Sequence, residues 1–234
     1  MSQLVYETAD ELASATADRL VAALAAAQAA RGTASVVLTG GRTGIAVLAA
    51  LRSATLDWSS LDIYWGDERF LPAGDPERNE TQAREALLDH VPVSPARVHP
   101  MAPSDGEFGD DPDAAAEAYA VLLKDVPSFD VCLLGVGEEG HTASIFPHSP
   151  AVYETARAVV AVRDCPKPPP TRVSLTLPTI RQASEVWLMT TGEAKAEPVA
   201  SALAGASEED VPAAGARGKR HTLWILDRAA ASRL

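Results

Sequence analysis

The chain has 234 residues, of which 47% are hydrophobic and 22% charged, the balance of an ordinary globular protein. Its net charge of −12 argues against nucleic acid or an anionic membrane as a partner, because both repel an acidic surface. No apolar run is long enough to span a bilayer, and the acidic N-terminus is unlike a signal peptide, so we expect a cytoplasmic protein. The two cysteines, Cys132 and Cys165, are too few for a disulfide framework, and we expect both thiols to be reduced.

The predicted elements alternate between helices and strands along the chain. Thr8 to Glu11 fits a capping box, and the Ala- and Leu-rich helix that follows it ends at Gly32. Further helices are predicted over 45–51, 77–89, 113–123, 180–183, 193–203 and 227–231. Strands are predicted over 35–38, 61–65, 129–134, 158–162, 172–177, 185–190 and 222–226, with a short candidate over 97–101. This alternation predicts an α/β fold with a mostly parallel central sheet covered on both faces, in a single domain over 1–234.

The first candidate site is the turn Thr39-Gly-Gly-Arg-Thr-Gly44, which lies between a predicted strand and a predicted helix. Glycines let the backbone approach an anion, and a helix N-terminus supplies free N–H groups and the positive end of a dipole. Arg42 adds a charge and Thr43 a hydroxyl group. The Gly-Lys-Ser/Thr ending of a P-loop is missing. Either the turn binds an anion, or it is a plain strand-to-helix turn with a solvated arginine.

The second candidate site, Gly66-Asp-Glu-Arg69, also follows a strand and therefore lies at the same edge of the sheet. Asp67 is a candidate to orient or move a proton, and Arg69 a candidate to hold an oxyanion or a phosphate. The alternative is a solvated run of charges, which is the commoner meaning of such a sequence.

The third candidate site follows the apolar strand over 129–134 and contains Gly135-Val-Gly-Glu-Glu-Gly140 and then His141. A histidine on a glycine-rich loop at the end of a buried strand is well placed for proton transfer at neutral pH. The glycines match a dinucleotide fingerprint, but Pro147 and Pro150 leave room for only about a turn and a half of the helix that the fingerprint needs. The spacing of His141 and His148 fits no helical pair of metal ligands, so neither a dinucleotide nor a metal site is favoured here.

Two further cations follow or begin strands. Lys195, in Gly192-Glu-Ala-Lys195, is predicted in the first turn of a helix, where a cation opposes the helix dipole unless an anion binds nearby. Arg172 begins a strand after a proline-rich connector and is a weaker candidate of the same kind.

Together these stretches resemble the 6-phosphogluconolactonase family, and they occur in the family's order. The resemblance covers nearly the whole chain and is carried by seven segments: TGGRTG at 39–44, GDERFLP at 66–72, Asn79 in ERNETQAREALL, LLGVGEEGHTASIFP at 133–147, RVSLTLP at 172–178, GEAKA at 192–196 and LWILDRAA at 223–230. The chain departs from the family pattern at Arg42 and Gly44, where Ser and Pro are more common, at Glu139, where Asp is frequent, and at His148, where Gly is common.

The resemblance implies a three-layer α/β/α fold shared with glucosamine-6-phosphate deaminase and ribose-5-phosphate isomerase. It also implies a cofactor-free and metal-free hydrolase of 6-phospho-D-glucono-1,5-lactone in the oxidative pentose phosphate pathway. A small sugar-phosphate lactone is then the expected partner, and we expect a monomer or a weak homodimer. His141 would act as the general base on water and Asp67 would orient it, with backbone N–H groups of 135–140 and Arg69 around the oxyanion. The remaining expected roles are substrate binding by Arg69 and Arg172, and phosphate binding by Gly40, Gly41, Arg42, Thr43 and Lys195.

Two alternatives remain open at this point. A deaminase or isomerase of aminosugar phosphates shares the fold, and Asp67 would then move the proton. A non-catalytic sugar-phosphate sensor would keep the phosphate turn without needing His141, but residues 1–35 contain one acidic helix and no helix-turn-helix.

Overall fold

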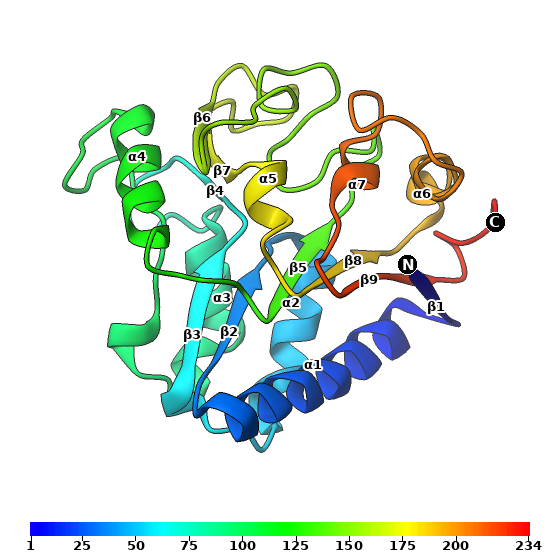
Figure 1. Cartoon of the computed structure of the whole chain (residues 1–234), viewed down its shortest axis with the longest axis horizontal. Helices are drawn as coiled ribbons and strands as arrows, with labels where there is room; N and C mark the ends of the chain where they lie inside the picture. Colours follow the sequence, from blue (N-terminus) through cyan, green and yellow to red (C-terminus); the bar gives the residue numbers. More distant parts are fainter.

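A parallel six-stranded sheet forms the centre of the molecule (Figure 1). The computed structural model describes all residues from Met1 to Leu234. Every neighbouring pair of strands in this sheet runs parallel. The strands, in spatial order, are β1 (Ser2–Tyr6), β9 (His221–Asp227), β8 (Glu185–Thr190), β5 (Val131–Gly135), β2 (Ala34–Leu38) and β3 (Leu61–Trp65). The side chains of β2, β5 and β8 are mostly apolar and buried, which suits strands that are covered on both faces. The edge strand β1 instead alternates between partly buried and exposed residues.

Three helices cover one face of the sheet: α1 (Ala9–Arg31), α2 (Gly41–Ala50) and α3 (Asn79–Ala86). The predicted capping box is confirmed in part, because Thr8 accepts a hydrogen bond from the Glu11 N–H, while the Glu11 carboxylate reaches the N–H of Glu7. Gly32, with a φ of 83°, ends α1 in the left-handed region that glycine adopts without strain.

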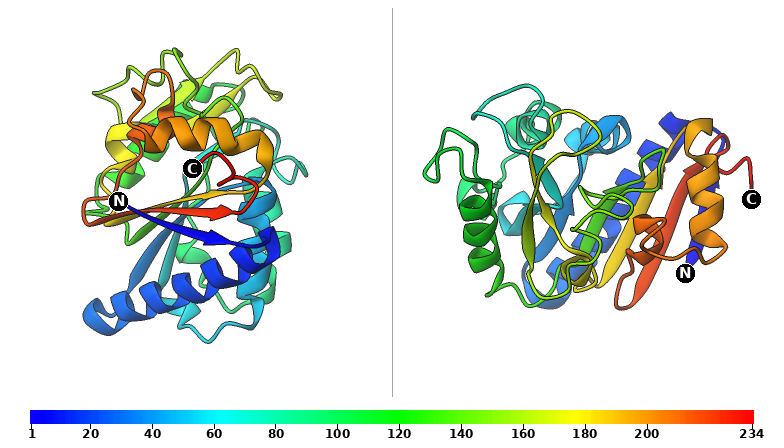
Figure 2. Two further views of the ribbon diagram at one scale, coloured as in Figure 1. Left: turned by 90° about the vertical axis from the view of Figure 1, so that its right-hand side faces the viewer. Right: turned by 90° about the horizontal axis from the view of Figure 1, so that it is seen from above.

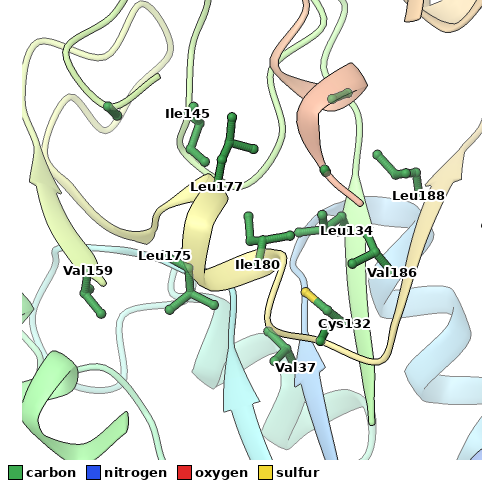
Figure 3. Close-up of a cluster of buried hydrophobic side chains, with 14 of the residues drawn as sticks. Val37, Cys132, Leu134, Ile145, Val159, Leu175, Leu177, Ile180, Val186 and Leu188 are labelled. Carbon is green, nitrogen blue, oxygen red and sulfur yellow. The ribbon is translucent and has the colours of Figure 1, made fainter. Parts of the chain in front are cut away.

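The opposite face carries α4 (Pro112–Leu123), α5 (Leu177–Ile180), α6 (Ala196–Leu203) and α7 (Pro212–Gly215). A second, antiparallel sheet of β4 (Asp67–Arg69), β7 (Arg172–Leu175) and β6 (Val159–Val162) lies on the same side. In the left view of Figure 2 the central sheet lies between α6 and α1. The core between the two sheets is apolar and includes Leu134, Leu175 and Ile180 (Figure 3). The predicted fold class is confirmed: helices cover both faces of a parallel sheet.

Several predicted elements differ from the observed ones. Asp67–Arg69 is a strand of the second sheet and not a loop, because its backbone pairs with β7. The strand predicted over 97–101 is wrong: only Val98 bridges to Ile63. The helix predicted over 227–231 is also wrong, since Asp227 ends β9 and turns follow. The strand β1 and the short helix α7 were not predicted.

The order of the strands reverses between β2 and β5. From β2 the chain moves outward to β3, whereas β5 is followed by β8 and β9 on the other side. In open α/β sheets, ligands bind beyond the carboxyl ends of strands at such a reversal. Here Val36 and Val37 of β2 pair with Val131 and Cys132 of β5, and the pairing stops before the carboxyl ends of the two strands. The strands therefore separate where a crevice is expected.

None of the helices combines the length and the apolar character that crossing a membrane requires.

Candidate active site

Two adjoining cavities lie beyond the carboxyl ends of the strands on either side of this reversal. The main cavity, of about 170 Å³, and the side cavity, of about 130 Å³, share the backbone of Gly40, Gly41, Gly135 and Val136 and the side chain of Lys195. Seven candidate residues line the main cavity: Gly40, Gly41, Asp67, Arg69, His141, Arg172 and Lys195. Arg42 and Thr43 line the side cavity. Segments far apart in the sequence therefore meet at one place.

The side cavity is built on the N-terminus of α2. This helix begins at Gly41, four residues earlier than predicted, so the glycine-rich turn is itself the first turn of the helix. Gly41 has a φ of 79°, which a residue with a side chain adopts only with strain. Arg42 is exposed and has no hydrogen-bond or ion-pair partner in the protein, while the Thr43 hydroxyl lies 2.9 Å from that of Thr191. A free guanidinium beside unpaired helix N–H groups is suited to a small anion.

Lys195 connects the two cavities. Its Nζ donates a 2.7 Å hydrogen bond to the carbonyl of Val136, at the end of β5. Burial lowers the pKa of this lysine, the nearby Lys167 and Arg42 lower it further, and the carboxylates of Glu138 and Glu139 oppose the shift. An ammonium group held among other cations in a half-buried place favours an anionic ligand that would neutralise the local charge.

His141 lies on a tight loop after β5. The loop is closed by hydrogen bonds from Gly137 N to the His141 carbonyl (2.8 Å) and from Thr142 Oγ1 to the Gly135 carbonyl (2.9 Å). The imidazole stacks on Phe146 with ring centroids 4.4 Å apart. A Cβ at residue 137 would lie 1.9 Å from Nδ1 of His141, so only glycine leaves room for the ring here.

A carboxylate lies beside one nitrogen of this imidazole, which makes no hydrogen bond within the protein. His141 Nδ1 lies 3.1 Å from Oε1 of Glu139 in an ion-pair contact, and Oε2 of the same carboxylate lies 3.0 Å from Nζ of Lys167. Burial lowers the pKa of His141; Glu139 opposes this shift and Lys167 reinforces it. The pKa of Glu139 is raised by burial, but its own backbone N–H, His141 and Lys167 together bring it below the ordinary value. The two shifts favour the neutral form of the imidazole and the ionised form of the carboxylate.

Both the side chain and the backbone of Asp67 accept hydrogen bonds from neighbouring segments. Its Oδ2 accepts a 2.7 Å hydrogen bond from Ser144 Oγ, and its backbone carbonyl accepts one of 2.9 Å from Asn79 Nδ2. The side chain is buried but still lines the main cavity. The neighbouring Glu68 points the other way, accepts the N–H groups of Asn79 and Glu80 at the start of α3, and lies 3.7 Å from Arg78.

The two predicted substrate-binding arginines are partly occupied by the protein itself. Arg69 donates from Nη1 to the carbonyl of Glu77 (2.6 Å). Arg172 donates from Nε to the carbonyl of Pro169 and from Nη2 to those of Lys167 and Pro168, at 3.0 to 3.2 Å. Both line the main cavity, but Arg172 mainly holds the loop that precedes it.

The loop geometry narrows the set of backbone N–H groups that could contact the oxyanion. The N–H of Gly137 is bonded to the His141 carbonyl and that of Gly140 to the Gly137 carbonyl. These two donors of the 135–140 segment are therefore used within the loop and are not free for a substrate.

Sequence reasoning missed several contributors to the site. Ser144 and Lys167 act through contacts with residues distant in sequence, and only the structure shows them. Glu139 lies two residues before His141 and stood out only as a departure from the family pattern. Asn79 had a sequence signal, because it lies in one of the segments that carry the family resemblance. Its buried Oδ1 has no hydrogen-bond partner, and a Cβ at Gly40 would lie 2.0 Å from it.

The structure contains no group of three or more His, Cys, Asp or Glu side chains arranged to hold a metal ion. The residues after Gly140 form no helix, so the loop lacks the element on which a dinucleotide pyrophosphate would rest.

An imidazole and a cluster of cations line cavities at the strand-order reversal of a parallel sheet, which is where α/β enzymes bind small ligands. The family model for glucosamine-6-phosphate isomerases and 6-phosphogluconolactonases matches residues 7–224. The chain belongs to this family. The predicted family and the prediction of an enzyme are thereby confirmed.

Individual relatives agree with this assignment. A 6-phosphogluconolactonase of Streptomyces coelicolor is 57% identical over 244 residues, which cover 99% of this chain and 94% of that protein. The solved 6-phosphogluconolactonase of Trypanosoma brucei is 31% identical, with a TM-score of 0.88 and coverage of 100% of this chain and 98% of that one. A monomeric glucosamine-6-phosphate deaminase, 22% identical with a TM-score of 0.85 and full coverage of both chains, shares the fold.

Proposed function

We propose that the protein hydrolyses 6-phospho-D-glucono-1,5-lactone to 6-phosphogluconate in the oxidative pentose phosphate pathway. The observation that supports this most directly is the meeting of His141 with the cations of the side cavity across one continuous crevice. The names of the curated relatives point to the same reaction.

The phosphate group would bind in the side cavity. Gly40 and Gly41 offer backbone that an anion can approach, and α2 contributes the positive end of its dipole. Arg42 and Lys195 would supply positive charge and Thr43 a hydroxyl group. These contacts position the sugar ring and leave its C1 carbonyl to the main cavity.

His141 would act as the general base. With the Glu139 carboxylate 3.1 Å from Nδ1, Nε2 would take a proton from water as the water oxygen attacks C1. The resulting tetrahedral oxyanion would be stabilised by Arg69, whose guanidinium lines the main cavity. When the bond between C1 and the ring oxygen breaks, His141 returns its proton to that oxygen, which becomes the free hydroxyl group of the product.

Asp67 would orient the substrate or His141 and not carry the proton. Its Oδ2 already accepts the Ser144 hydroxyl, and its backbone is tied to Asn79. This arrangement favours a fixed charge. It counts against the aminosugar-phosphate deaminase alternative, in which Asp67 would be the mobile base.

The non-catalytic sensor alternative is also disfavoured. Such a sensor would need only the phosphate-binding groups, whereas His141, with Glu139 3.1 Å from its Nδ1, also lines the main cavity.

The test is consumption of freshly generated 6-phosphogluconolactone, corrected for spontaneous hydrolysis, with wild-type protein and with His141→Ala. Wild type should accelerate hydrolysis, and the variant should lose about 10²- to 10⁴-fold in kcat with a modest change in KM. Ammonia release from glucosamine 6-phosphate is measured in parallel. A lactonase rate no higher than the spontaneous one would refute the proposal, and ammonia release would replace it with the deaminase.

A further inference from the structure

The loop between β6 and β7, residues 163–171, carries a cation into the active site. It contains Pro166, Pro168, Pro169 and Pro170, which restrict its backbone, and Cys165 N bonds to the Pro170 carbonyl across it (3.0 Å). Lys167 extends from this loop to Glu139, with Nζ 3.0 Å from Oε2. The reaction outlined above assigns this lysine no role.

The loop is held in place by a buried arginine. Three carbonyls of the loop, those of Lys167, Pro168 and Pro169, accept hydrogen bonds from Arg172, which is only 6% exposed. The Arg172 guanidinium also lies over the Phe146 ring, 5.8 Å from its centroid, and His141 stacks on that same ring. The loop, the arginine and the imidazole therefore form one packed unit, and the backbone of Lys167 is fixed relative to His141.

The Glu139 carboxylate lies between Lys167 and His141. One of its oxygens contacts His141 Nδ1 and the other contacts Lys167 Nζ. A glutamate has one more rotatable bond than an aspartate, so its carboxylate can adopt more positions. A partner on the second oxygen would restrict the carboxylate to the position next to the imidazole. With that partner, the carboxylate stays ionised and keeps the Nδ1–H tautomer of the imidazole, and Nε2 is the free base.

We propose that Lys167 is a positioning residue of the lactonase reaction, which holds the Glu139 carboxylate against His141 Nδ1 from a loop that prolines and Arg172 make rigid. The expected kinetic effect rests on the proposed function, whereas the contacts of Lys167 do not depend on it.

The charged groups around His141 determine in which direction its pKa should change when Lys167 is replaced. Glu139 on its own loop and Asp67 on β4 raise the pKa of His141, whereas burial and Lys167 lower it. Arg69, Arg172 and Lys195 line the same cavity. If Lys167 holds Glu139 in place, Lys167→Met releases the carboxylate from Nδ1. Because Glu139 raises the pKa of His141 more than Lys167 lowers it, this pKa should then fall, whereas loss of the lysine charge alone would raise it.

The experiment compares wild type, Lys167→Met, Lys167→Arg and the control Lys124→Met, an exposed lysine at the end of α4. The kcat for the lactone is measured from pH 5.5 to 7.5, where spontaneous hydrolysis is slowest. Lys167→Met should lower kcat by about threefold to tenfold, because the imidazole loses the carboxylate that orients it, and should move the acid limb of the profile to lower pH. Lys167→Arg and Lys124→Met should keep the wild-type profile.

A second readout does not depend on activity. The His141 ring is titrated by NMR, with its signals assigned through a His141→Gln variant. Its pKa should fall in Lys167→Met, and a rise would show that Lys167 acts through its charge and does not position Glu139. A uniform loss of kcat without a shift of the profile would show a merely structural role, and an unchanged pKa with unchanged kinetics would also overturn the inference. If wild type hydrolyses no lactone, the proposed function fails, but the titration still decides on Lys167.

Discussion

Ser144 Oγ donates a 2.7 Å hydrogen bond to Oδ2 of Asp67, so the loop that carries His141 is joined directly to the strand β4. Both side chains are buried, and the two residues are 77 positions apart in the chain. This bond sets the distance between the imidazole loop and the acidic strand, on which the shape of the main cavity depends.

Removal of the Ser144 hydroxyl group should destabilise the folded protein. In Ser144→Ala the buried Asp67 carboxylate loses a donor, and we expect a loss of about 2 kcal/mol in the free energy of unfolding, as for other hydrogen bonds to a charged group. Urea denaturation measures the loss, and the exposed Ser232→Ala serves as the control. A loss in Ser144→Ala no larger than that of the control would mean that the bond does not hold the two segments together.

Gly137→Ala tests the space around the imidazole. The new Cβ would lie 1.9 Å from His141 Nδ1, so the ring must move. A displacement of about 1 Å at a catalytic group costs about 100-fold in rate, and we expect kcat to fall by this order. Gly66→Ala is the matched control, because its Cβ would meet its nearest neighbours at 3.6 Å, an ordinary contact. A Gly137→Ala enzyme within twofold of wild type would contradict the assignment of His141.

Lys195→Met tests the phosphate site. Loss of a charge-assisted contact should raise KM for the phosphorylated lactone by about 10- to 100-fold, with a smaller effect on kcat. Activity on unphosphorylated gluconolactone, which lacks the group that Lys195 would bind, should change little. Lys219→Met, at an exposed position, is the control. Equal losses on both lactones would place Lys195 at the reacting end of the sugar instead.

Glu68 should make stability depend on pH. Burial raises its pKa to about 7, against the opposing effects of Arg78 and three backbone N–H groups. Since the folded pKa lies above the unfolded one, this group's contribution is fully present below about pH 4.5 and is lost as the pH rises through about 7, a change of about 3 kcal/mol.

The Glu68→Gln variant removes that titration. The difference in unfolding free energy between wild type and Glu68→Gln, measured in urea from pH 4.5 to 8, should move in favour of the variant by up to that amount as the pH rises. Parallel stability curves for the two proteins would show that Glu68 is ionised throughout and that the ion pair with Arg78 outweighs burial.

Much of the fold was predictable because its signals are local. The strands at 61–65 and 185–190 were predicted with the observed bounds, since continuous apolar runs mark strands buried on both faces. The start of α2 was placed four residues late, because glycines indicate a loop unless tertiary contacts make them helical. β4 was missed because its three charged residues resemble a surface run, and only its pairing with β7 makes them a strand.

The sequence by itself determined which chemical groups are present and on which side of the sheet they emerge: His141, Lys195, Arg42 and Asp67 all follow strands. Only the tertiary structure decided which of them are free and which are held. Lys167 and Arg172 show this, because the first reaches Glu139 and the second is bonded to loop carbonyls. Such contacts join residues that are distant in the chain, and their geometry follows from the packing of whole layers, which no local pattern encodes.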